Sequence, residues 1–161
     1  MESNLCNICT TSNFRKVEEK MPLQAVSFCS QKAAQDCQPL SGWAMISITN
    51  SGDAQANLKD GWERVLRLKF DDVDAAEEPF ALFSEQQARC VIQFAHQCHK
   101  EKIEGILVHC TAGVSRSAAV AKWIADCYQL PFNEKYMLYN KHVHKVLRNE
   151  YIAIENETDH I

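Results

Sequence analysis

The sequence predicts an α/β fold in which a central, mostly parallel sheet is flanked by helices. Two observations support this prediction. Short runs of apolar and β-branched residues alternate along the chain with segments of helical periodicity, which is the order expected when strands and crossover helices follow one another. In addition, the run Gly105–Cys110 (GILVHC) is almost continuously apolar, as is typical of a central parallel strand buried on both faces.

Three further strands and a short helix are predicted in the first half of the chain. Leu23–Ser30 is predicted to be a short buried strand, and Gln31–Cys37 a brief helix. Trp43–Thr49 is apolar and β-branched, which predicts a second strand. In Trp62–Phe70, apolar and basic residues alternate after an irregular Val65, and this alternation favours a strand with one covered face.

The second half of the chain contains the longer helices. Ser84 is expected to be the N-cap of a helix that runs to about Lys100, because apolar residues follow it at helical spacing. Ala118–Tyr128 is small and apolar at helical period, and Tyr136–Arg148 is predicted to be the final helix. An acidic loop, Asp71–Pro79, precedes the Ser84 helix.

The domain boundaries follow from the same pattern. Residues 1–20 are polar and aperiodic, which predicts a loosely ordered leader, and 21–161 is predicted to be a single domain with one core. Cys6 and Cys9 form a CxxC pair in the leader. A zinc site needs a second ligand pair, and none lies at a convincing spacing, so we interpret these cysteines as two unligated thiols.

Composition limits the classes of function. No apolar run approaches the roughly 18 residues needed to cross a bilayer, and the first residues lack the layout of a secretory signal. A formal charge of −4 argues against a broad nucleic-acid-binding surface. Eight cysteines in a chain without a signal peptide indicate reduced thiols. The sequence therefore predicts a cytoplasmic protein with neither a membrane nor a nucleic-acid partner; it predicts no oligomeric state.

The stretch that follows the apolar strand has the residues of an anion site. Cys110 ends the strand, and Arg116 and Ser117 immediately precede the next predicted helix. Unpaired N–H groups and the helix dipole attract an anion at such a junction, and a loop whose amides point inward forms a nest for phosphate. The five residues expected to bind the anion through this loop are Thr111, Ala112, Gly113, Val114 and Ser115.

The residue types at this junction suit nucleophilic attack on phosphorus. The same amides and dipole stabilise a Cys110 thiolate, the Arg116 fork can grip two phosphate oxygens, and the Ser117 hydroxyl can donate to the sulfur when it leaves. A buried cysteine alone is more often inert. The Cys-x5-Arg-Ser spacing, the central glycine and the flanking strand and helix together favour the catalytic interpretation.

The segment His109–Ser117 (HCTAGVSRS) resembles the signature loop of the cysteine-dependent protein tyrosine phosphatases, and the compact dual-specificity members are the most similar in length. The resemblance spans roughly Leu23 to Arg148. It implies a dual-specificity phosphatase-like fold, a phosphorylated protein substrate, a phosphocysteine intermediate and no metal or cofactor. In this family, His109 would order the loop rather than act as a base. Phosphotyrosine is the expected substrate, with phosphoserine and phosphothreonine left open.

The resemblance also implies a general acid, an aspartate on a loop after an upstream strand. Three aspartates qualify: Asp71, Asp72 and Asp74. Leu68 and Phe70 lie on one face of the predicted strand, and Asp72 continues that series whereas Asp71 points the other way. Asp72 is therefore the first choice, and Asp71 and Asp74 stay alternatives.

Three other functions compete with a protein phosphatase. A phosphatase for RNA ends or phosphoinositides would use the same loop chemistry, although lipid-directed relatives tend to carry lysines inside this loop and here there are none. A rhodanese-type sulfurtransferase also places a cysteine in an anion-binding loop. A non-catalytic phosphopeptide-binding module typically lacks the cysteine or the arginine, and both are present.

Overall fold

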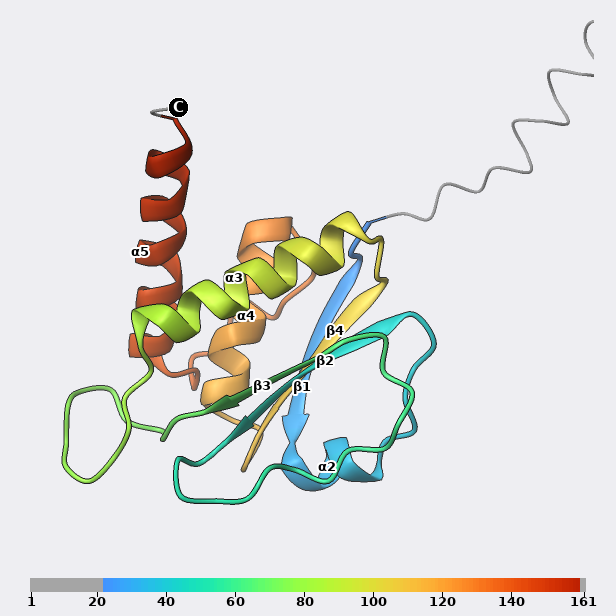
Figure 1. Cartoon of the computed structure of the whole chain (residues 1–161), viewed down its shortest axis with the longest axis horizontal. Helices are drawn as coiled ribbons and strands as arrows, with labels where there is room; N and C mark the ends of the chain where they lie inside the picture. Colours follow the sequence, from blue (N-terminus) through green and yellow to red (C-terminus); the bar gives the residue numbers. More distant parts are fainter. Residues whose placement is uncertain (1–21, 160–161) are drawn as a thin grey trace, which may run out of the picture.

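The computed structural model describes residues 22–159, and its core is a four-stranded, entirely parallel sheet. This confirms the predicted α/β fold with a central parallel sheet. Along the sheet, β4 lies between β1 and β2, and β3 forms the second edge (Figure 1). The four strands are β1 (Ala25–Ser30), β2 (Trp43–Thr49), β3 (Val65–Lys69) and β4 (Gly105–Cys110).

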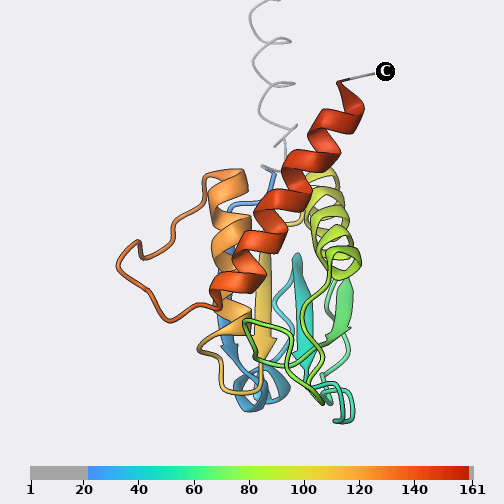
Figure 2. The ribbon, with the colours of Figure 1, turned by 90° about the vertical axis from the view of Figure 1, so that its left-hand side faces the viewer.

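Helices cover the sheet unequally on its two faces. On one face, α3 (Glu85–Lys100) and α4 (Arg116–Tyr128) pack against the strands, and α5 (Lys141–Thr158) crosses over both of them (Figure 2). The opposite face is covered by α2 (Gln31–Asp36) and part of the connection between β2 and β3. The sheet therefore has a large core on one side and a small one on the other.

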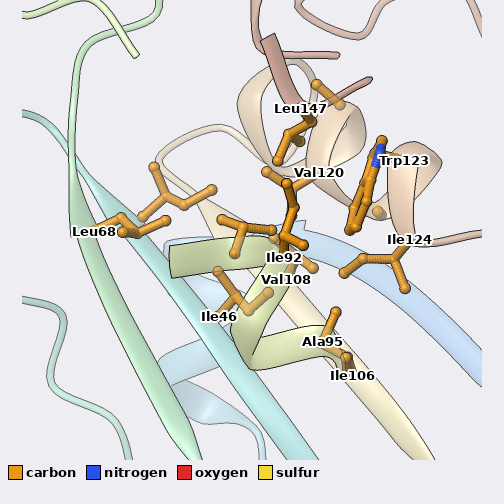
Figure 3. Packing of buried hydrophobic residues seen from close by; sticks show 14 of the residues in the cluster. Ile46, Leu68, Ile92, Ala95, Ile106, Val108, Val120, Trp123, Ile124 and Leu147 are labelled. Atoms are coloured by element: carbon orange, nitrogen blue, oxygen red, sulfur yellow. The ribbon is translucent and has the colours of Figure 1, made fainter. Parts of the chain in front are cut away.

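The alternation of side chains along the strands creates these two cores. Ile46, Ile106 and Val108 point into the large core, whereas Met45 and Leu107, their neighbours in sequence, belong to the small one. Each fully buried side chain of this size contributes about 1.5–3 kcal/mol relative to exposure. The helices meet these strand residues with Ile92 and Ala95 of α3, Val120, Trp123 and Ile124 of α4, and Leu147 of α5 (Figure 3).

The long helix α3 starts where the sequence predicts. The Ser84 hydroxyl accepts a hydrogen bond from the Gln87 amide, and the Gln87 side chain bonds back to the Ser84 backbone, which completes a capping box. Its buried face repeats at helical spacing and contacts β3 and α5. Predicted and observed ends both fall at Lys100.

Two of the predicted strands differ from the structure. Leu23–Ser30 was expected to be buried, but β1 is an edge strand whose residues are half-buried or exposed. The reason is topological, because β4, from much later in the chain, occupies the place beside β2. The strand predicted over Trp62–Phe70 is limited to Val65–Lys69, and Trp62 instead packs in the small core.

The last two helices begin elsewhere than predicted. The final helix was expected over Tyr136–Arg148, but α5 starts at Lys141, because the side chain of Asn140 caps it, and it continues to Thr158. Its apolar face extends beyond the predicted end, where Tyr151 packs against Trp123. Helix α4 starts at Arg116, two residues before the predicted Ala118.

The remaining predictions concern the leader, membrane-spanning helices and metal sites. The predicted leader at 1–20, with Cys6 and Cys9, lies outside the described residues. Within residues 22–159, no helix combines the length and the apolar character that a membrane span requires. Over the same range, no three metal-ligating side chains are grouped so that they could hold an ion.

Candidate active site

The loop between β4 and α4 lies at the carboxyl edge of the parallel sheet, where open α/β folds bind their ligands. Gly113 in this loop has φ +74, which favours glycine. A Cβ atom at this position would stand 2.4 Å from the Ser30 nitrogen and 2.5 Å from the Cys29 carbonyl carbon. The loop is thus pressed against the end of β1, and the amide of Gln31 donates to the carbonyl of Thr111 at 3.2 Å.

The helix after the loop starts without a side-chain cap. Ser115 is the N-cap residue of α4, yet its hydroxyl makes no capping bond. The hydroxyl donates instead to Oδ1 of Asp72, at 2.8 Å. The first-turn amides of α4, which a serine usually helps to satisfy, therefore keep their capacity to bind an anion. We call the loop 111–115, with Cys110 at its base and Arg116 beside it, the cup.

Cys110 lies at the base of the cup with 2% of its surface exposed. Its Sγ is 3.1 Å from the Ser117 hydroxyl and accepts a hydrogen bond from the Gly113 amide at 3.2 Å. Burial acts to raise the pKa of the thiol, but hydrogen bonds from the Ser117 hydroxyl and amide and from Gly113, together with the charge of Arg116, outweigh it. The net effect lowers the pKa of Cys110 and favours the thiolate.

The Arg116 side chain is 4% exposed and is fixed at two of its three nitrogens. Its Nη1 donates to the carbonyl of Phe70 at 2.7 Å, and its Nη2 donates to the Thr111 hydroxyl at 3.1 Å. The buried Nε has no hydrogen-bond partner among residues 22–159. A buried guanidinium N–H without a partner is costly, and a bound anion in the cup is one group that would satisfy it.

His109, which precedes the nucleophile, is fully buried and is held at both ring nitrogens. Its Nδ1 lies 3.2 Å from the carbonyl oxygen of Cys110, and its Nε2 lies 2.6 Å from the hydroxyl of Ser47 in β2. Burial lowers the pKa of this imidazole, so the ring is neutral. Because a carbonyl can only accept, Nδ1 carries the proton and Nε2 accepts from Ser47. This arrangement fits a residue that orders the loop.

The aspartates of the acidic loop have separate surroundings. Asp72 accepts hydrogen bonds from Ser115 and from Asn140, whose Nδ2 is 2.9 Å from Oδ1. Asp71 instead accepts from the hydroxyl and amide of Ser51, at 2.6 and 3.0 Å, and from the amide of Ala81, at 2.7 Å. The Ser51 hydroxyl, followed by the Ala81 amide, lowers the pKa of Asp71. Asp72 is hydrogen-bonded to Ser115 of the cup, whereas Asp71 is hydrogen-bonded to Ser51 and to Ala81 at the far end of the acidic loop.

An open hollow of about 400 Å³ adjoins the cup. Its walls include Asp72, Asp74 and Glu77 from the acidic loop, and Lys141 from the start of α5. The Lys141 ammonium donates to the carbonyl of Met137 and lies 3.3 Å from the centroid of the Tyr139 ring. The hollow therefore presents three carboxylates and a lysine that is already engaged.

The remaining loop residues of the sequence-based site also lie at the cup. Thr111, Ala112 and Val114 are exposed, and Gly113 is half-buried. The carbonyl of Val114 accepts a hydrogen bond from the Tyr136 hydroxyl at 2.5 Å, which ties the segment before α5 to the loop. The structure thus brings Asp72, the loop and Arg116 together, and it places Asp74 in the adjoining hollow.

Two residues of this region, Ser47 and Asn140, were not among the candidates predicted from the sequence. Ser47 is a single serine in an apolar strand, and no local pattern distinguishes it. Asn140 immediately precedes helix α5 and accepts from the Val143 amide as its N-cap. An asparagine before a helical segment is a recognised start signal, so the cap was predictable, but the contact with Asp72 was not.

No protein-family model matches this chain, and no curated protein matches it. Among solved structures, it is similar to the human tyrosine phosphatase-like serine/threonine/tyrosine-interacting protein, with 21% sequence identity, coverage of 70% of this chain and 77% of that chain, and a TM-score of 0.46. A likeness of this size establishes neither family nor activity. The chemistry proposed for the site rests on its own geometry.

Proposed function

We propose that this protein is a cysteine-dependent phosphatase that hydrolyses phosphotyrosine in proteins through a phosphocysteine intermediate. The observation that carries the proposal is the pairing of two groups at one cup. Cys110 Sγ receives hydrogen bonds that favour its ionised form, and the buried Arg116 Nε beside it lacks a partner. A nucleophile and an unsatisfied cationic donor at a helix N-terminus suit a phosphate monoester.

In the first step, the Cys110 thiolate attacks phosphorus and forms the S–P bond while the bond from phosphorus to the leaving oxygen breaks. Arg116 and the loop amides bind the equatorial oxygens, where charge gathers. The leaving oxygen takes a proton from the carboxylic acid of Asp72, which lies beside the cup through its bond to Ser115. The products of this step are a neutral alcohol or phenol and the phosphocysteine.

In the second step, water attacks the phosphocysteine and the S–P bond breaks. The Asp72 carboxylate takes a proton from that water, so the acid of the first step is regenerated. The Ser117 hydroxyl, 3.1 Å from Sγ, stabilises the sulfur as it leaves as a thiolate. Inorganic phosphate is released, and the thiolate and the acid are ready for another cycle.

A protein substrate agrees with the surroundings of the cup better than a polyanion does. The hollow beside it contains Asp72, Asp74 and Glu77, whose charges oppose an RNA end or a multiply phosphorylated inositol. Large exposed apolar side chains also lie on segments that border the cup or the hollow, and they suit contacts with a polypeptide. These side chains are Phe80, Val114, Met137 and Leu138.

The decisive variant is Cys110→Ser. We expect the native chain to hydrolyse p-nitrophenyl phosphate and a phosphotyrosine peptide, and Cys110→Ser to lose more than about 10³-fold in kcat while still binding the peptide. Cys90→Ser removes an exposed thiol and is the matched control, expected to keep full activity. Turnover of thiosulfate in place of phosphate esters would identify a sulfurtransferase and overturn the proposal.

The acid is assigned by a second pair of variants. Asp72→Asn should slow cleavage of phenyl phosphate by about 100-fold, because the leaving oxygen loses its proton donor. Asp71→Asn should keep most activity but lower Tm above pH 5. The hydrogen bonds that lower the pKa of Asp71 make its ionised form stabilising there, and this contribution fades as the pH falls through its pKa. The reverse outcome would assign the acid to Asp71.

A further inference from the structure

Asn140 joins three segments around the cup and is itself only 7% exposed. Its Oδ1 accepts from the Val143 amide at 3.0 Å as the cap of α5, and its backbone N–H donates to the Ser115 carbonyl at 3.1 Å. Its Nδ2 donates to Asp72 Oδ1 at 2.9 Å and to the Val73 carbonyl at 3.1 Å. Both ends of the amide therefore have partners of the right kind, and these partners fix its orientation.

The two oxygens of Asp72 are unequal as a result. Oδ1 accepts two hydrogen bonds, from the Ser115 hydroxyl at 2.8 Å and from the Asn140 amide at 2.9 Å. Within residues 22–159, no hydrogen bond is formed to Oδ2. A carboxyl oxygen offers about two lone-pair sites, so Oδ1 is saturated by these donors. An acidic proton on this group has to be on Oδ2.

We propose that Asn140 is a positioning residue for proton transfer, which acts with Ser115 to fix the carboxyl of Asp72 so that Oδ2 is the oxygen that delivers the proton. The inference rests on the proposed phosphatase activity. Asn140 does not touch the reacting atoms. It acts by orienting Asp72 and by linking the acidic loop to the cup, since its backbone N–H is bonded to Ser115.

The proposed arrangement defines the path of the proton in both steps. When the bond from phosphorus to the leaving oxygen breaks, the proton passes from Oδ2 of Asp72 to that oxygen, and the carboxylate charge is stabilised at Oδ1 by the two donors. When water attacks the phosphocysteine, Oδ2 takes the proton back. The two donors remain in place throughout, so the carboxyl does not have to turn between the steps.

Asn140→Ser separates the two functions of this side chain. Serine is as good an N-cap as asparagine, so the start of α5 is retained, whereas the amide donor to Asp72 is lost. The measurement is kcat for phenyl phosphate and for p-nitrophenyl phosphate, whose leaving group is less basic and needs less help from an acid. We expect about a tenfold loss with phenyl phosphate and less than about threefold with p-nitrophenyl phosphate.

A double-mutant cycle with Asp72→Asn tests whether Asn140 acts through Asp72. In the Asp72→Asn background, we expect Asn140→Ser to leave the ratio of the two kcat values unchanged, because there is no acid left to position. An equal loss on both esters in the native background, or a change of the ratio in the Asp72→Asn background, would overturn the inference while the phosphatase activity stands. Failure of the native chain to hydrolyse either ester would instead overturn the proposed function.

A second variant covers the case in which Asn140→Ser does not fold. Ser115→Ala removes the other donor to Oδ1 and leaves the α5 cap intact. The native Ser115 side chain makes no capping hydrogen bond to α4, so the substitution removes none. We expect the same selective loss with phenyl phosphate, again by about tenfold. An unaltered ratio of the two esters in Ser115→Ala would contradict the two-donor arrangement.

Discussion

Two junctions between a strand and a helix lie side by side at the carboxyl edge of the sheet. In the first, β1 leads directly into α2, and in the second β4 leads through the cup into α4. The strands are paired so that Cys29 lies beside His109 and Ser30 beside Cys110. Each junction therefore has a cysteine at or near its strand end and a serine as the helix N-cap.

The two serines are used differently. The hydroxyl of Ser30 accepts a hydrogen bond from the Ala33 amide at 3.2 Å and so caps α2. The hydroxyl of Ser115 donates to Asp72 and leaves α4 without a side-chain cap. The first junction satisfies its own helix, whereas the second leaves amides free for an external anion.

The thiols of Cys29 and Cys110, one at each junction, differ in the direction in which their pKa is shifted. Burial raises the pKa of Cys29 to about 11, and the neighbouring Cys37 and Cys110 add to this effect. Burial also opposes ionisation of Cys110, yet hydrogen-bond donors and the charge of Arg116 lower its pKa. A position at or near the carboxyl end of a strand therefore does not by itself activate a cysteine. What activates it is a loop that turns its donors toward the sulfur.

The largest expected difference between the junctions is in the titration of their thiols. At pH 9, Cys29, with a pKa of about 11, is about 1% ionised, whereas Cys110 is mainly thiolate. We expect iodoacetate at pH 9 to alkylate Cys110 much faster than Cys29, which stays largely unmodified. Mass spectrometry of the alkylated peptides distinguishes the sites. Equal modification of the two thiols below pH 9 would contradict the expected difference between the pKa of Cys29 and that of Cys110.

The close packing of the cup against the end of β1 depends on Gly113. Gly113→Ala places a Cβ 2.4 Å from the Ser30 nitrogen and 2.5 Å from the Cys29 carbonyl carbon, at a φ of +74, so the backbone must shift. We expect a loss of about 2 kcal/mol in the free energy of unfolding, measured by urea denaturation. Gly52→Ala, with nothing within 4 Å of its Cβ, is the control and should change stability by less than about 0.5 kcal/mol.

The smallest expected effect concerns one hydroxyl. Ser117→Ala removes a donor to Cys110 Sγ and should raise the pKa of the thiol toward its ordinary value, so alkylation at neutral pH slows by about tenfold and its midpoint moves to higher pH. Ser30→Ala at the other junction removes a helix cap and should cost about 1 kcal/mol of stability without moving the Cys110 midpoint. A midpoint that is unchanged in Ser117→Ala would show that the amides of Gly113 and Ser117 and the charge of Arg116 lower the pKa without the hydroxyl.

A contact of the site was predictable from the sequence when its residues lie close together in the chain. The residues of the cup are contiguous, so the spacing from Cys110 to Arg116 and the glycine between them predicted their proximity without knowledge of the fold. Strand phase made Asp72 the first choice among the three aspartates, and Asp72 is the one bonded to the cup. Its service as the acid stays a prediction.

Features that depend on long-range topology were not predictable. β1 is an edge strand because β4 separates it from β2, and the composition of Leu23–Ser30 gives no sign of this. The contact between Asn140 and Asp72 joins residues 68 positions apart. The true start of α5 followed from a local cap, but the apolar residues between 136 and 139 obscured it, because they continue the helical pattern toward the N-terminus.

The hydrogen bonds of Asp71 have a consequence for how the chain tolerates insertions and deletions. The Asp71 amide donates to the Ala81 carbonyl at 2.8 Å, and the Asp71 carboxylate accepts from the Ala81 amide, so the acidic loop is closed at its base. Asp72 lies next to this closure. Loop-closure entropy grows only slowly with length, so we expect changes in the number of residues between 75 and 79 to cost little stability. The length of the acidic loop is then expected to vary without displacing Asp72.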